Sequence, residues 1–251
     1  MLRYRIIPLV LLDGYSVLKT IQFDVRRNLG NPITIARIYN TRNVDELILL
    51  DIDATRENRR IDMVTIEDVA SECFMPLCVG GGLKTIADIS EALARGADKV
   101  SINSVALANP SFIAEASRTF GNQCIIVSVD VKRDAQGCPR IHSPLSAVSS
   151  HSVVEWCRQA EDLGCGEILL NSVDRDGTMN GFDMDLIQQV TSAVTVPVIA
   201  AGGAGTPAHF FDVIHDAEAS AVAAASIYHF TNETPRSVKE YLARNGIAVR
   251  L

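Results

Sequence analysis

The octapeptide ELILLDID, residues 46–53, and the related stretch EILLNSVD, residues 167–174, decide the fold. Each is an apolar run that opens on glutamate and closes on aspartate, which is typical of a buried strand ending in a polar turn. The segments PLCVGGG and PVIAAGGAG lie further along the chain at the same separation of 121 positions. Two resemblances at one offset, near half the chain length, predict two similar halves, about residues 1–120 and 121–251.

Eight short apolar runs, rich in β-branched residues, alternate along the chain with segments of helical period. The runs are Arg5–Leu11, Glu46–Asp51, Pro76–Val79, Lys99–Ile102, Ile125–Asp130, Glu167–Leu170, Pro197–Ala200 and Ala219–Ala225. Strands that alternate with helices form a parallel sheet covered by helices. Eight such units in 251 residues predict an α/β protein with one (β/α)8 TIM barrel over residues 1–251. A doubly wound open sheet is the alternative, but no G-x-G-x-x-G follows the first run.

Composition excludes several classes of function. The net charge of −7 argues against nucleic acid as a partner. The apolar runs are too short to cross a membrane, and no cleavage site follows the first of them, so we expect a cytoplasmic protein. The six cysteines form no Cys-x-x-Cys motif and have no histidine at zinc spacing. We therefore expect no metal and no cofactor.

Glycine-rich turns follow the third and seventh runs, at the end of the barrel where phosphate is commonly held. Glycine lets backbone N–H groups approach phosphate oxygens closely, although ordinary turns also need glycine. Two places predict a small-molecule ligand phosphorylated at both ends. The first comprises Gly81, Gly82, Asn103 and Ser104, and the second comprises Asp176, Gly177, Gly202, Gly203, Ala225 and Ser226.

The segments RIIP, DELILLDIDAT, GADKVSIN, DRDGT and GGAG resemble the cyclase subunit of imidazole glycerol phosphate synthase, a HisF-like family of histidine biosynthesis, over essentially the whole chain. The resemblance implies a barrel that receives ammonia from a HisH-like glutaminase docked at its N-terminal face. The ammonia converts a bis-phosphorylated ribulose-formimino nucleotide into imidazole glycerol phosphate and aminoimidazole carboxamide ribotide. Aspartates at the ends of strands 1 and 5 supply the proton transfers that ring closure needs.

The resemblance places one of these aspartates and fails to place the other. Asp130 matches the acid of strand 5, whereas the position of the strand 1 acid falls on Leu11, which cannot carry a proton. Asp13, two residues on, is the alternative acid. The loop 142–152, HSPLSAVSSHS, also lacks the lysine of the family's substrate-covering segment.

Four further charges match the family's ammonia gate at the N-terminal end of the barrel. They are Arg5, Glu46, Lys99 and Glu167, and Asp98 beside them matches a partner-docking position. Simple stabilising salt bridges are the alternative explanation, because the lower face of a barrel usually serves stability.

Two hypotheses follow from a retained gate beside a missing acid. In the first, the chain conducts ammonia from a glutaminase to a sugar amidotransferase, as in a divergent branch of the family linked to surface-polysaccharide (lipopolysaccharide O-antigen) biosynthesis. In the second, it is an active cyclase with Asp130 and Asp13 as its acid–base pair. A related isomerase of histidine biosynthesis is a third reading, and Leu11 counts against it as well.

Overall fold

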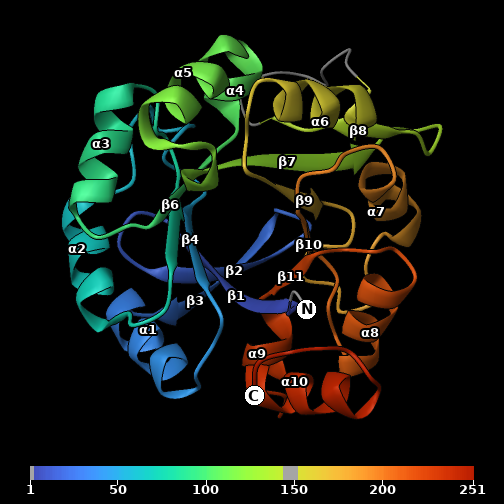
Figure 1. The fold of residues 1–251 in the computed structure, drawn as a ribbon. Helices are drawn as coiled ribbons and strands as arrows, with labels where there is room; N and C mark the ends of the chain where they lie inside the picture. Colours follow the sequence, from blue (N-terminus) through green and yellow to red (C-terminus); the bar gives the residue numbers. More distant parts are fainter. Residues whose placement is uncertain (1–2, 144–151) are drawn as a thin grey trace.

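The computed structural model describes residues 3–143 and 152–251 and contains a closed barrel of eight parallel strands (Figure 1). Each strand pairs with the next around the ring, and the pairing of Arg5 with Ala221 begins the register that closes it. The strands are β1 (Arg5–Leu12), β4 (Leu47–Asp51), β5 (Leu77–Gly80), β6 (Lys99–Ile102), β7 (Ile125–Arg133), β9 (Glu167–Ser172), β10 (Val198–Ala201) and β11 (Ala221–Ala224). The predicted (β/α)8 barrel is confirmed.

Helices form a ring around the strands (Figure 1). They are α1 (Pro32–Thr41), α2 (Met63–Glu72), α3 (Ile86–Ala94), α4 (Ser104–Ala108), α5 (Ser111–Phe120), α6 (Val153–Asp162), α7 (Met184–Thr191), α8 (Pro207–His215), α9 (Ser226–Phe230) and α10 (Pro235–Arg244), with a 3₁₀ turn at Asn122–Cys124. α3 begins with a capping box, in which Thr85 and Asp88 each accept a hydrogen bond from the other's backbone N–H. None of the described helices is long and apolar enough to span a bilayer.

Within residues 3–143 and 152–251, three strands lie outside the barrel and were not predicted. β2 (Val17–Ile21) and β3 (Val25–Gly30) form an antiparallel hairpin that continues from the end of β1. β8 (Pro139–Ile141) pairs with the last residues of β7, which explains why β7 runs three residues past its predicted end at Asp130. Both additions lie at the C-terminal ends of barrel strands, where they border the functional site.

The alternation of side chains along each strand produces two apolar cores. Ile6 and Val10 of β1 point outward into the larger core between strands and helices. Ile7, Leu9 and Leu11 point inward, into a core that fills the barrel axis with aliphatic side chains. The axis therefore contains a dry, packed lumen between the two ends of the barrel.

Candidate functional site

A cavity of about 490 Å³, here called the mouth cavity, opens at the C-terminal ends of the barrel strands. Its floor is formed by inward-facing residues of the strands, and its rim by the loops and hairpin that follow them. The polar floor residues include Ser101, Ser128, Asp130 and Asn171, and the apolar ones include Leu9, Leu11, Leu50 and Leu169; Asp51, Asn103 and Asp176 also line the cavity. This is the end of the barrel at which the sequence predicted the chemistry.

Asp130 lies partly buried on the floor, at the end of β7, with one amide on each of its oxygens. Asn103 donates to Oδ2 at 2.8 Å, and Asn171 donates to Oδ1 at 3.1 Å. Loss of water raises the pKa of Asp130 to about 6; the two amide hydrogen bonds act against that shift, and the charge of Asp176 adds to it. A carboxyl group with such a pKa can both take up and release a proton near neutral pH.

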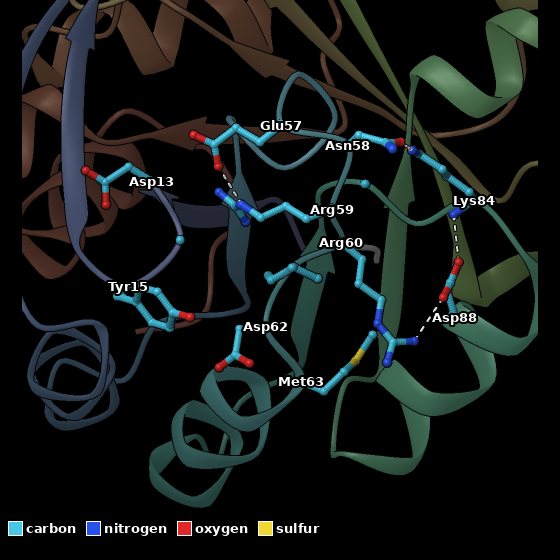
Figure 2. A pocket seen from close by; sticks show the side chains of 13 residues that line it. Asp13, Tyr15, Glu57, Asn58, Arg59, Arg60, Asp62, Met63, Lys84 and Asp88 are labelled. Atoms are coloured by element: carbon cyan, nitrogen blue, oxygen red, sulfur yellow. Dashed lines mark hydrogen bonds and ion pairs between the residues drawn. The ribbon is translucent and has the colours of Figure 1, made fainter.

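Leu11 lines the same mouth cavity from β1, where it is 5% exposed. Asp13 lies beyond the strand, exposed, and accepts a hydrogen bond from the backbone N–H of Ser16 at 3.2 Å. It lines a separate cavity of about 610 Å³, here called the side cavity, together with Tyr15 and Arg59 (Figure 2). The structure therefore places Asp13 and Asp130 in different cavities.

A different carboxyl group, that of Asp176, reaches the mouth cavity. Asp176 is buried and accepts a hydrogen bond from the Thr20 hydroxyl at 2.6 Å. Lys19 lies buried beside it; loss of water lowers the pKa of this amine, and the charge of Asp176 partly restores it. Asp176, which the sequence assigned only to a phosphate site, is thus near enough to Asp130 to influence its pKa.

The four residues of the first predicted phosphate site lie together at the mouth cavity, and phosphate binding there stays a prediction. Gly81, Gly82, Asn103 and Ser104 all line it. Gly82 has a φ of +65°, and a Cβ there would run into the backbone carbonyl of Arg59. Only glycine fits this turn, which leaves its backbone open to the cavity.

The second predicted phosphate site lies at the neighbouring strand ends, and only Asp176 of its members is among the described lining residues of the mouth cavity. Gly202 and Gly203 follow β10 with φ values of +87° and +113°. Ala225 and Ser226 lie where α9 begins, and Gly177 packs against the backbone of Thr20. This site stays a prediction.

The four predicted gate residues form a closed ring of alternating charge at the opposite end of the barrel. Arg5 donates to Glu46 at 2.6 Å and to Glu167 at 2.5 Å, and Lys99 donates to Glu46 at 3.1 Å and to Glu167 at 2.6 Å. The ring closes the N-terminal end of the lumen, because Arg5, Lys99 and Glu167 are the first residues of β1, β6 and β9 and Glu46 directly precedes β4.

Within this charged ring (Arg5, Glu46, Lys99 and Glu167), neighbouring charges shift the pKa values of Lys99 and Glu167 toward the ionised forms. Burial alone would raise the pKa of Glu167, but the hydrogen bond and charge of Arg5, with those of Lys99, hold it below its ordinary value. Burial would likewise lower the pKa of Lys99, and the two glutamates raise it instead. Asp98 is exposed beside the ring and accepts a hydrogen bond from the backbone N–H of Leu77 at 2.8 Å.

Comparison with known proteins agrees with this arrangement. A family model described as "Histidine biosynthesis protein" matches residues 5–234. The imidazole glycerol phosphate synthase subunit HisF of Dehalococcoides mccartyi is 43% identical over 251 residues, which cover all of this chain and 99% of that protein. The chain belongs to the histidine biosynthesis protein family. The predicted HisF-like relationship is confirmed, while nothing in these matches distinguishes the polysaccharide-linked branch.

Several polar residues of this family member were not predicted as site residues. Asn171 and Thr20 each hold an acid of the mouth cavity, and Asp51 is held by Arg59. One feature of the sequence could have indicated Asn171: it is a polar residue at the end of an otherwise apolar run. Most of the loop 142–152, whose lack of lysine the sequence singled out, lies outside the described residues. In the part of the chain that the structure describes, no three His, Cys, Asp or Glu side chains are arranged to hold a metal ion.

Proposed function

We propose that this chain is the ammonia-accepting subunit of a glutamine-dependent synthase. A HisH-like glutaminase docks at the N-terminal end of the barrel, against the charged ring and Asp98, and releases ammonia there. The observation that carries the proposal is the arrangement along one axis: a closed charged ring, an aliphatic lumen, and a cavity with a proton-transfer group at its floor.

The lumen selects the neutral form of the nitrogen donor. An ammonium ion would lose its water among Ile7, Ile48 and Ile126 without gaining a partner, which is strongly unfavourable. Ammonia carries no charge and keeps its lone pair, so it crosses and can attack an acceptor in the mouth cavity. The charged ring borders the inner core at the N-terminal end of this path.

The acceptor reaction that the family supports best is the cyclase reaction. In it a bis-phosphorylated ribulose-formimino nucleotide binds across the mouth, with one phosphate at Gly82 and Ser104. Asp130 transfers protons at one reacting position, since its pKa of about 6 suits both directions of transfer. Asp176 is the second carboxyl group, because it lines the same cavity as Asp130, whereas Asp13 does not.

Turnover with an ammonium salt tests this reaction without a glutaminase. The purified chain should consume the nucleotide at alkaline pH, and Asp130→Asn should slow it on the order of 10²-fold or more. Asp176→Asn should slow it similarly. If Asp13→Asn slows turnover by a comparable factor while Asp176→Asn does not, Asp13 is the second proton-transfer group instead of Asp176.

A second candidate function rests on Leu11. An aliphatic side chain occupies the mouth position at which the family resemblance requires an acid. The chain then conducts ammonia to an acceptor on another subunit, a sugar amidotransferase of surface-polysaccharide biosynthesis.

The two functions separate in one comparison of the wild type with Leu11→Asp and Leu11→Asn. If the chain is a conduit, the wild type stimulates glutaminase yet does not consume the nucleotide, and Leu11→Asp gains turnover that Leu11→Asn does not. Robust turnover by the wild type excludes the conduit. Leu11→Asn is the matched control, since it introduces a polar group of the same shape without a titratable proton.

A further inference from the structure

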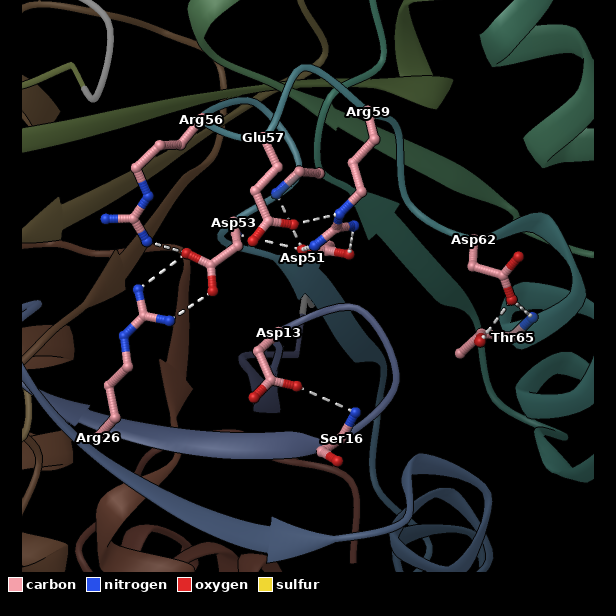
Figure 3. Close-up of polar contacts among 11 residues, drawn as sticks. Asp13, Ser16, Arg26, Asp51, Asp53, Arg56, Glu57, Arg59, Asp62 and Thr65 are labelled. Atoms are coloured by element: carbon pink, nitrogen blue, oxygen red, sulfur yellow. Dashed lines mark hydrogen bonds and ion pairs between the residues drawn. The ribbon is translucent and has the colours of Figure 1, made fainter.

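Two arginines share one buried aspartate at the rim of the mouth cavity. Arg26 reaches Asp53 from the β2–β3 hairpin, and Arg56 reaches it from the loop between β4 and α2 (Figure 3). Both guanidinium groups line the mouth cavity, as does Lys84. Neither the cyclase reaction nor the ammonia path described above uses this arginine pair (Arg26 and Arg56).

The two arginines play different parts in the structure. Arg26 holds both oxygens of Asp53 with its two terminal nitrogens, one at 2.8 Å, and so ties the hairpin to the loop. Arg56 is three residues from Asp53 in the same loop. Its ion pair with Asp53 therefore does not connect parts of the chain that are distant in the sequence. It uses only Nη2 for this contact, and its remaining donors, Nε and Nη1, have no partner among the described residues. Its side chain is 58% exposed.

The rim brings two arginines and a lysine near Asp53, and the charges of Asp13 and Glu57 also act on Arg26. Asp53 stays ionised, because the hydrogen bonds from Arg26 and Arg56 hold its pKa below the ordinary value although burial acts the other way. One carboxylate therefore faces two guanidinium groups. Lys84 adds a further cation, and its Nζ donates to the neutral amide of Asn58 at 2.6 Å.

From this geometry we infer that the arginine pair binds a second oxyanion of the ligand, next to the phosphate held at Gly82. The inference rests on the proposed phosphate site, whose residues Gly82 and Ser104 line the same cavity as Arg56. Planar arginine forks match phosphate and carboxylate groups. The ligand class is a compound with two neighbouring oxyanions, a diphosphate or a phosphate beside a carboxylate. The cyclase substrate is phosphorylated once at each end and lacks this feature, so the inference concerns a further ligand of the same phosphate site.

Calorimetric titration of the full chain with three small anions tests the inference. Orthophosphate offers a single phosphate, pyrophosphate offers a neighbouring phosphate, and phosphonoacetate offers a neighbouring carboxylate. We expect the preferred two-headed anion to bind on the order of tenfold more tightly than orthophosphate, as a charge-assisted hydrogen-bonded pair allows. If pyrophosphate binds more tightly than phosphonoacetate, the second oxyanion of the ligand is a phosphate; if phosphonoacetate binds more tightly, it is a carboxylate.

Variants then locate the added affinity. Arg56→Gln should remove the advantage of the two-headed anion and leave orthophosphate affinity within about twofold. Arg56→Lys keeps the charge without the fork and should retain part of the advantage. Arg60→Gln is the matched control, because it removes the same charge from a residue paired with Asp88 and Glu91 in the side cavity.

Each result is decisive. Orthophosphate binding with no gain for either two-headed anion overturns the inference and leaves the phosphate site intact. Equal weakening of all three anions by Arg56→Gln also overturns it, since Arg56 then belongs to the first phosphate. If none of the anions binds the wild type, both the phosphate site and the inference built on it are wrong.

Discussion

At the scale of single residues, Asp130 combines an unfavourable position with a useful pKa. Its pKa in the folded protein, about 6, lies above the ordinary value of 3.8, so folding favours the protonated form. The contribution of Asp130 to the free energy of unfolding therefore falls as the pH rises from 3.8 to about 6. Asp130→Asn removes the charge and keeps the shape. We expect it to raise the free energy of unfolding by about 1–2 kcal/mol near neutral pH, with a smaller gain at about pH 5. Urea denaturation at the two pH values measures both.

Asp13→Asn is the matched control for this measurement. Asp13 is exposed, and its carboxylate accepts a hydrogen bond from the backbone N–H of Ser16. The same chemical change there should alter stability by no more than about 0.5 kcal/mol. A gain from Asp130→Asn that is equally large at both pH values would show that desolvation of the carboxylate is not its cause.

The two amides on Asp130 make a second prediction. Asn171→Leu removes one of the two donors to the carboxylate and should raise its pKa above about 6, by about one unit. Carbon-13 NMR of labelled aspartate reports this pKa directly, and Asp130→Asn assigns the resonance. Asn245→Leu, in an exposed position after α10, is the control. An unchanged or lowered pKa in Asn171→Leu would contradict the geometry.

At the scale of elements, the sequence predicts the barrel strands well and the hairpin not at all. The eight strands are runs of apolar residues because each is buried on both faces. β3, in contrast, is exposed along nearly its whole length and reads VRRNLG, so no apolar pattern marks it. β2 carries Lys19 in its middle, which breaks its apolar run. The rim built on this hairpin was therefore invisible in the sequence.

The partners within the site were unpredictable for a related reason. A polar residue at a strand end can be recognised locally, as Asp130 was. Its contacts to Asn103 and Asn171 span 27 and 41 positions and depend on which strands become neighbours in the ring. The pairing of Arg26 with Asp53 likewise needs the hairpin to fold back over the mouth.

The turn after β5 allows a prediction at the element scale. Gly82→Ala introduces a Cβ that meets the Arg59 backbone, so the turn must move; we expect a loss of about 2 kcal/mol or more in stability together with weakened orthophosphate binding. Gly137→Ala is the matched control. Gly137 also has a positive φ, of +80°, but no described atom lies within 4 Å of its added Cβ. It should cost about 1 kcal/mol and leave phosphate binding unchanged.

At the scale of the whole molecule, the barrel separates two tasks along its axis. The N-terminal end holds charges that neutralise one another, and the C-terminal end holds charges that line the mouth cavity. The aliphatic lumen between them insulates the two ends. The division into similar halves stays a prediction from the repeated segments. It agrees with the placement of Glu46 and Glu167 at equivalent points of the charged ring, 121 positions apart.

The charged ring yields a prediction about stability and pH. Arg5→Met leaves Glu46 and Glu167, which are 1% and 8% exposed, with Lys99 as their only partner within the ring. Removing one member of a buried ion network typically costs about 3–5 kcal/mol. Part of this loss should disappear as pH falls, since a buried glutamate that lacks Arg5 has a raised pKa and is relieved by protonation. Urea denaturation at about pH 5 and near neutral pH measures the change.

The exposed ion pair of Arg37 and Glu72 is the control for the stability loss expected from Arg5→Met. Arg37→Met breaks the exposed pair with Glu72, whose side chains are 60% and 31% exposed, and should cost no more than about 1 kcal/mol at either pH. If Arg5→Met costs equally little, water reaches the charged ring freely. An aliphatic lumen behind such a ring would not be closed to hydrated ammonium, and the selection of neutral ammonia would then have to occur elsewhere along the axis.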